Sequence, residues 1–293
     1  MTRTPASQSR IAQRFAHLAQ RGEGALVPFV VAGDPDLDVT LRVMRALARA
    51  GADVLELGVP FSDPLADGPV NQAAYDRALR AGATVEGVLG LVARFRAEWE
   101  TPVVLMTYSN PVTQYGWEKF ADAAAHAGVD GVLLTDLPPE EAEAWLEHAR
   151  AAGLDTIFLL APTSPDERIE LVGRLASGYV YCVSRLGVTG ARDQLPPEAR
   201  TLVERVRAKV ELPIVVGFGL SRPEQVRAVC EFADGAVVGS ALVELIAQHA
   251  ATNELGATSP EVAGSSRGLE TARPLEQVVE SFAAALKQAT ISG

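Results

Sequence analysis

Eight apolar runs of strand length recur from residue 25 onward, and each is followed by a longer, helix-like segment. Because the runs are apolar almost throughout rather than alternating, they predict parallel strands buried on both faces by helices. Eight such units favour a closed (β/α)8 TIM barrel over an open sheet. The runs lie at residues 25–33, around Glu56, and at 102–110, 131–137, 155–162, 179–184, 213–219 and 235–240.

The helix-like segments carry apolar residues at helical spacing, most clearly from Val85 to Phe95. Several segments end in a similar phrase, ARAGADVLEL, AHAGVDGVLL or ARAAGLDTIF, in which a glycine can end the helix before the next strand. We expect an extra N-terminal helix and an extended C-terminal tail helix over 274–288, with Val278, Phe282 and Leu286 facing inward.

A single barrel domain is expected over residues 1–293, because about 250 residues suffice for this fold. Residues 250–272 are rich in Gly, Ser, Thr and Ala, which predicts a flexible insertion before the last helix.

The charge balance argues against nucleic-acid and membrane partners. With 26 basic and 37 acidic residues the net charge is −11, and binding to either polyanion depends on clustered Lys and Arg. Neither a signal-peptide core nor an apolar stretch of about 18 residues is present, so a cytoplasmic protein is expected. The two cysteines, Cys182 and Cys230, offer no disulfide framework and fit small buried residues.

Three carboxylates gather in the stretch LELGVPFSDPLADGPV, residues 55–70. Glu56 lies inside an apolar strand, where burial should raise its pKa and suit it to donate and accept a proton. The alternative is that Glu56 is a structural acid held by an ion pair or a hydrogen bond. Asp63 and Asp67 lie on the following Pro- and Gly-rich loop, where either could instead stabilise its own loop through Asx-type bonds.

Glycine turns follow the seventh and eighth predicted strands, where barrels commonly hold phosphate. Gly217, Gly219 and Gly239 allow close backbone approach, and a helix beginning near Ser240 would direct free N–H groups at an anion. The alternative is that these glycines only make tight turns.

The predicted strand ends carry neither a lysine for a Schiff base nor histidines for a catalytic metal. Lys119, Lys209 and Lys287 fall on helical segments, which argues against a Schiff base. The four histidines are helical and scattered, which argues against a catalytic metal. No metal and no cofactor are therefore expected in this chain, and carboxylate acid/base chemistry on a phosphorylated substrate remains.

The phrases LELGVPFSDPLADGPV, VPFVVAGDP, SRLGVTG, VGFGLS and VVGSALV together closely resemble the tryptophan synthase alpha chain family, from about Gly24 to Gln248. The resemblance implies a lyase that cleaves indole-3-glycerol phosphate to indole and glyceraldehyde 3-phosphate in tryptophan biosynthesis. Glu56 would be the acid/base at indole C3 and the glycerol hydroxyl, Asp67 would hold the indole N–H, and Tyr181 would orient Glu56.

The resemblance also implies the remaining site residues. Phe29 and Phe218 would line the indole pocket, and Thr189 and Gly190 would belong to a lid that closes over Asp67. Main-chain amides would bind the phosphate at the positions Gly217, Phe218, Gly219, Gly239, Ser240 and, from the lid, Gly190.

A partner is implied in the same way. The family docks on a pyridoxal-phosphate-containing beta chain in an αββα tetramer, and Pro60, Asp63, Asn110 and Pro138 would contact it. Two alternatives stay open: a free-standing lyase that releases indole, and a degenerate barrel that serves only as an allosteric partner.

Overall fold

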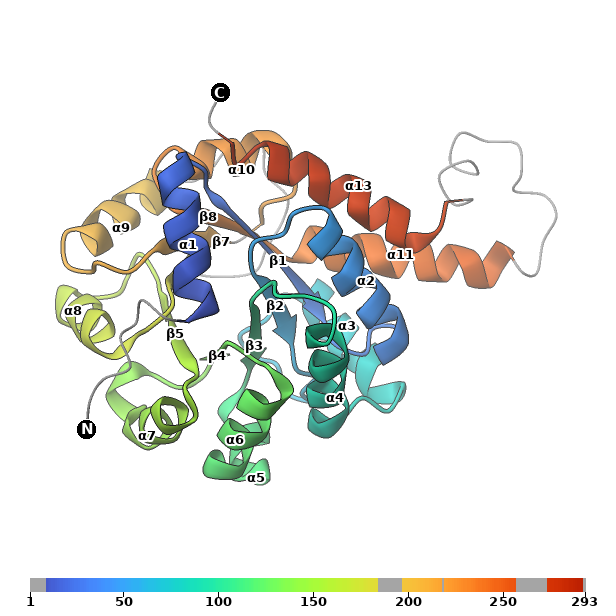
Figure 1. Ribbon diagram of the computed structural model, residues 1–293, viewed down its shortest axis with the longest axis horizontal. Helices are drawn as coiled ribbons and strands as arrows, with labels where there is room; N and C mark the ends of the chain where they lie inside the picture. The colour runs from blue at the N-terminus through green and yellow to red at the C-terminus, as the bar shows by residue number, and fades with distance from the viewer. Residues whose placement is uncertain (1–8, 184–196, 218, 257–272, 292–293) are drawn as a thin grey trace.

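A computed structural model describes residues 9–183, 197–217, 219–256 and 273–291 of the chain. Eight parallel strands form one closed barrel in sequence order, with β8 paired to β1, and helices surround it (Figure 1). The TIM barrel expected from the sequence is therefore confirmed.

The strands are shorter than the apolar runs, because the runs continue into the loops at the mouth of the barrel. Their bounds are β1 Ala25–Val31, β2 Leu55–Gly58, β3 Val103–Thr107, β4 Gly131–Leu134, β5 Asp155–Leu160, β6 Val180–Val183, β7 Ile214–Gly217 and β8 Gly235–Val238. The register aligns Phe29 of β1 with Glu56 of β2 and Glu56 with Val104 of β3. These three side chains therefore point to the same face, the barrel interior.

The helices that the structure describes are α1 Arg10–Arg21, α2 Leu37–Arg49, α3 Pro69–Arg80, α4 Val85–Arg96, α5 Ser109–Tyr115, α6 Trp117–Ala127, α7 Glu143–Ala152, α8 Asp166–Leu175, α9 Pro197–Arg207, α10 Pro223–Cys230, α11 Ser240–Gly256 and α13 Leu275–Gln288, with a 3-10 turn η2 at Pro139–Glu141. Alternation along the strands divides the core into two layers. One fills the barrel, and the other lies between strands and helices. No described helix combines the length and apolarity needed to cross a bilayer.

Helices α3 and α5 were not anticipated. Pro69 opens α3 in a Pro- and Gly-rich stretch, and its buried face consists of Ala74, Tyr75 and Ala78 rather than an aliphatic stripe. Helix α5 is polar, and Val112 is its buried residue. The run 102–110, expected as one strand, therefore ends as a strand at Thr107.

The tail helix α13 is present, but its expected inward face was partly wrong. Val279, Ala283 and Leu286 are buried, whereas Val278 is only partly covered. The buried stripe of α13 is shifted by one residue, from Val278 to Val279 and from Phe282 to Ala283, because α13 packs on α2, α10 and α11 together. Helix α11 continues to Gly256, and the rest of the expected insertion, 257–272, lies outside the described residues.

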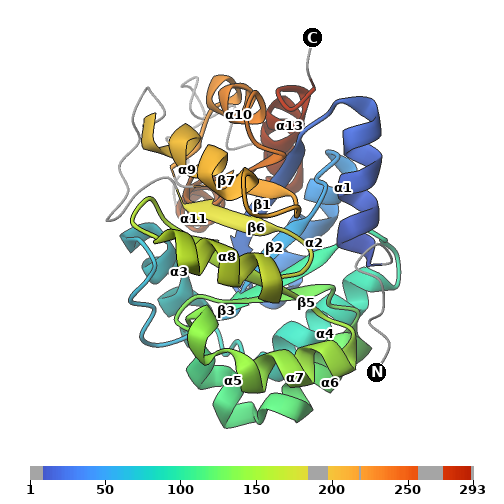
Figure 2. The same ribbon diagram turned by 90° about the vertical axis from the view of Figure 1, so that its left-hand side faces the viewer.

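The two ends of the barrel differ. In Figure 2, α1 lies at one end of the strands, and α3 lies toward the other. Ser9 accepts a hydrogen bond from the Ala12 N–H and so begins α1. Phe15 and Leu18 of α1 then join the interior cluster at the amino ends of the strands.

Candidate active site

Glu56 lies inside the barrel, and 1% of its surface is exposed. Burial raises its pKa to about 8, the nearby charge of Asp67 adds to this, and a hydrogen bond from the Tyr179 hydroxyl to Oε1 (3.3 Å) opposes it. At neutral pH most of this carboxyl is therefore protonated, as a general acid requires.

Asp67 lies where the loop after β2 meets α3, and 8% of its surface is exposed. The Tyr108 hydroxyl donates to Oδ2 at 2.6 Å, and the Asn71 amide donates to Oδ1 at 3.2 Å. Burial raises the pKa of Asp67, while these two bonds favour its ionised form and so lower it. Tyr108 also accepts a hydrogen bond from the Ala66 N–H at 3.1 Å, so it links the loop to the end of β3.

Glu56 and Asp67 line one cavity of about 110 Å³ at the carboxyl ends of the strands. Phe29, Met106 and Tyr181 supply apolar and aromatic walls, and Gly219, Gly239 and Ser240 line the same cavity. Carboxylates, an aromatic wall and glycine turns therefore meet at one place. The arrangement suits a flat aromatic ligand with an anionic group.

Steric constraints explain why glycine occupies positions 217 and 219. Gly219 has φ +76°, a left-handed conformation that favours glycine. A Cβ on Gly217 would lie 2.2 Å from the Tyr181 hydroxyl, so Gly217 makes room for that phenol rather than lining the cavity. Ser240 begins α11, whose first N–H groups lack acceptors within the helix.

Among the described residues, Tyr179 rather than Tyr181 donates to Glu56. Tyr181 lies on β6, and Tyr179 directly precedes that strand; both belong to the interior cluster, and Tyr181 lines the cavity nearer its mouth. Tyr179, Tyr108 and Asn71 were absent from the residues expected from the sequence. For Tyr179 and Tyr108 a usable signal was present, because one shares a strand face with Tyr181 and the other follows β3 directly.

The four residues expected to contact a partner lie on loops and helix starts at the mouth of the barrel. Asp63 and Asn110 are exposed, Pro138 is partly buried, and Pro60 is buried. Leu65, two residues after Asp63 on the same loop, has 89% of its surface exposed. Three other expected site residues, Thr189, Gly190 and Phe218, lie outside the described residues.

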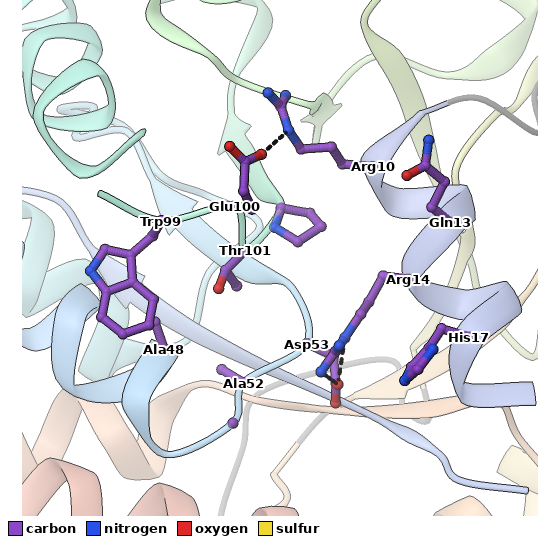
Figure 3. A pocket seen from close by; sticks show the side chains of 12 residues that line it. Arg10, Gln13, Arg14, His17, Ala48, Ala52, Asp53, Trp99, Glu100 and Thr101 are labelled. Carbon is purple, nitrogen blue, oxygen red and sulfur yellow. Dashed lines mark hydrogen bonds and ion pairs between the residues drawn. The ribbon is translucent and has the colours of Figure 1, made fainter. Parts of the chain in front are cut away.

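A second cavity, of about 570 Å³, lies at the amino ends of the strands between α1 and two helix-to-strand turns (Figure 3). Its charged side chains are satisfied by one another. Arg10 contacts Glu100 at 2.9 Å, and Arg14 contacts Asp53 at 2.6 Å. In TIM barrels this end carries stability rather than catalysis, so the smaller cavity is the candidate active site.

Lysine amines are remote from the described cavity. Lys119 and Lys287 lie on helices, Lys209 lies just past the end of α9, and its amine contacts Glu170 at 2.5 Å. Within the described residues no three His, Cys, Asp or Glu side chains form a metal-binding group.

Comparison with known proteins gives a consistent result. A family model described as tryptophan synthase alpha chain matches residues 15–272. A tryptophan synthase alpha chain from Pelobacter propionicus is 47% identical over 285 residues, covering 97% of this chain and 99% of its own.

Solved structures of tryptophan synthase chains superimpose on this chain over most of its length. Tryptophan synthase subunit alpha from Legionella pneumophila superimposes with a TM-score of 0.84 at 36% identity, covering 97% of this chain and 98% of that one. A chain of the tryptophan synthase complex from Pyrococcus furiosus superimposes with a TM-score of 0.77 at 36% identity, covering 90% and 98%.

Proposed function

Since the chain belongs to the tryptophan synthase alpha chain family, lyases that cleave indole-3-glycerol phosphate to indole and glyceraldehyde 3-phosphate, we propose that Glu56 and Asp67 carry the chemical steps. One observation supports this most strongly: two buried acids on different elements line one aromatic-walled cavity. The two acids differ in environment, which allows them different protonation states.

Glu56 acts as acid and then as base. Its protonated carboxyl, favoured by a pKa of about 8, donates a proton to indole C3. The resulting carboxylate accepts the proton of the glycerol hydroxyl on the carbon bonded to C3. As the carbon–carbon bond breaks, its electron pair returns to the indole ring, an aldehyde forms, and Glu56 is protonated again. The cycle needs no external oxidant or base.

Asp67 stabilises the cationic intermediate. Protonation at C3 places positive charge on the ring nitrogen, and an ionised carboxylate that accepts its N–H lowers the energy of that state. Tyr108 and Asn71 donate to this carboxylate and so favour the required ionised form.

The glycine turns are proposed to hold the phosphate. Gly219, Gly239 and Ser240 line the cavity at the ends of β7 and β8, and the start of α11 favours an anion. Gly217 contributes indirectly by leaving room for Tyr181. Phe218, Thr189 and Gly190 are proposed as further ligand and lid positions on the family resemblance alone.

We also propose a tryptophan synthase beta chain as partner, in an αββα assembly in which the beta chain holds pyridoxal phosphate. The similarity to a chain of the Pyrococcus furiosus complex supports a partner in general. Exposed Asp63, Asn110 and Leu65 surround the mouth from which indole would leave.

Indole release from indole-3-glycerol phosphate tests the roles of the two acids. Glu56→Gln removes the transferable proton, so activity should fall roughly 10²- to 10⁴-fold, the usual range for a general acid/base. Asp67→Asn should lose roughly 10²- to 10³-fold, as for one electrostatic stabiliser. Far-ultraviolet circular dichroism should show both variants folded. Retention of most activity by Glu56→Gln would overturn the mechanism.

A further inference from the structure

Asn71 lies one helical turn beyond Asp67, on α3, and lines the same cavity as Glu56, Asp67 and Phe29. The reaction described above assigns Asn71 no contact with substrate. Its side chain nevertheless presents two polar groups at the proposed indole pocket.

The orientation of the Asn71 amide is fixed by its neighbour. Nδ2 lies 3.2 Å from Asp67 Oδ1, and an ionised carboxylate can only accept. The amide nitrogen must therefore face Asp67. The carbonyl oxygen Oδ1 is directed elsewhere, is shielded from solvent, and has no hydrogen-bond donor among the described residues.

A buried carbonyl without a donor is unfavourable, so the missing donor is informative. Tyr75 lies four residues later on α3, one helical turn beyond Asn71. Its hydroxyl lies beside Gly58 and Phe29, 2.8 Å from where a Cβ on Gly58 would be, and it too lacks a partner in the described chain. The donor for Asn71 must therefore enter with a ligand or a water molecule.

We propose that Asn71 Oδ1 accepts a hydrogen bond from the indole N–H and shares that hydrogen with Asp67. The inference rests on the proposed function. An indole ring has one polar hydrogen and no strong acceptor, which matches an acceptor pair on adjacent turns. The ring of Phe29 lies between positions 58 and 239, because a Cβ on Gly239 would lie 3.3 Å from it and one on Gly58 2.8 Å. The turn at Gly239 is the proposed phosphate site, and it lies on a different element from Asn71 and Asp67. The glycerol phosphate would extend toward that turn, so its hydroxyls are the poorer donors for Asn71.

Two ligands of similar shape test the hydrogen bond from the ring N–H to Asn71. They are 3-(indol-3-yl)propyl phosphate and its benzothiophene counterpart, in which sulfur replaces the N–H. Calorimetry on the full chain would measure both dissociation constants. Asn71→Leu keeps the size of the side chain and removes the acceptor. It should weaken the indole ligand about tenfold, as for one hydrogen bond, and leave the benzothiophene ligand unchanged. Equal effects on both ligands, or no effect, would contradict the proposal and indicate that water satisfies Oδ1.

Asn71 also holds Asp67, so a second background separates direct from indirect action. In Asp67→Ala, Asn71→Leu should still weaken the indole ligand selectively if Asn71 contacts the N–H. If Asn71 acts only by orienting Asp67, the selective effect disappears and the proposal fails. Cleavage of indole-3-glycerol phosphate by the unaltered chain is measured first. Its absence would refute the proposed function, whereas cleavage together with unchanged selectivity refutes only the role of Asn71.

Discussion

At the scale of single residues, the proposed mechanism needs opposite protonation states of two acids in one small cavity, a neutral Glu56 and an ionised Asp67. Glu56 is surrounded by apolar side chains, and the single described donor to it is a 3.3 Å phenol contact, so the neutral form is favoured. Asp67 is buried as well, but it receives a 2.6 Å phenol bond and an amide bond. Burial raises the pKa of both carboxyls, but the two hydrogen bonds to Asp67 favour its ionised form more than the one long bond to Glu56 does.

The pH dependence of cleavage follows from the pKa of Glu56. Ring protonation requires the neutral carboxyl, which prevails below about pH 8 and is lost above it. The value of kcat/KM should therefore fall about tenfold per pH unit above that point, because one essential proton dissociates from the free enzyme. A stopped indole assay between pH 6 and 10 measures this. An alkaline limb that began near pH 5 instead would show Glu56 with an ordinary pKa and contradict the role as acid.

Tyr108→Phe tests whether the phenol keeps Asp67 ionised. It removes a charge-assisted bond worth roughly 1.5–3 kcal/mol, so kcat/KM should fall about 10- to 100-fold. The acid limb of the pH profile should also move upward, because the ionised form of Asp67 loses a donor. Tyr115→Phe is a matched control on α5, where the ring packs on Phe120 away from the cavity. Equal losses in both variants would point to general destabilisation.

Residue identity in the site was only partly predictable. Glu56 stood out because an acid inside an apolar strand is unusual, whereas only the family resemblance singled out Asp67 from Asp63 on the same loop. Tyr179 did not, since the sequence places Tyr179 and Tyr181 on one strand face without fixing which reaches Glu56. That choice depends on the stagger of β6 against β2 across the barrel, which only the closed structure defines.

At the scale of elements, the existence of the eight strands was predictable because each is a continuous apolar run, although the runs extend past the strand ends into the loops. Helices α3 and α5 were not, because proline and polar residues dominate their first turns and the buried face of α3 is two alanines and a tyrosine rather than an aliphatic stripe. Because α3 was not predicted, its residues Asn71 and Tyr75 could not be placed near the site from the sequence. Only a helix at that place puts Asn71 one turn from Asp67.

Two glycines on different elements should respond oppositely to alanine. In β7, a Cβ on Gly217 would lie 2.2 Å from the Tyr181 hydroxyl, so Gly217→Ala must displace that ring and should cost about 1–3 kcal/mol. In α4, exposed Gly90 has no atom within 4 Å of the added methyl, and Gly90→Ala should stabilise by roughly 0.5–1 kcal/mol. Urea unfolding would measure both changes. Indole release should fall only in Gly217→Ala, and a harmless Gly217→Ala would show that Tyr181 moves without consequence.

At the scale of the whole molecule, one carboxylate connects the beginning and end of the chain at the amino end of the barrel. Asp53 is fully buried and accepts hydrogen bonds from the Leu26 N–H of β1 (2.7 Å), the Arg14 guanidinium of α1 (2.6 Å) and the Lys287 amine of α13 (2.9 Å). Figure 3 shows the side chains of Arg14 and Asp53 in contact at the edge of the larger cavity. That cavity is therefore bordered by ion pairs that hold terminal helices to the barrel.

Asp53→Ala should destabilise the whole barrel rather than the active site. Removing the acid leaves the Leu26 N–H and two cations without their buried partner, a change that costs roughly 3–5 kcal/mol. Arg94→Ala is the control, because its pair with Asp38 is exposed on both sides and should contribute less than about 1 kcal/mol. Thermal and urea unfolding measure the two losses.

Since Asp53 lies at the end of the barrel opposite the site, the folded fraction of Asp53→Ala should keep its kcat for indole release. A variant of normal stability would mean that the terminal helices are held by their apolar faces alone, whereas a stable variant with lower kcat would mean that this end of the barrel influences the site.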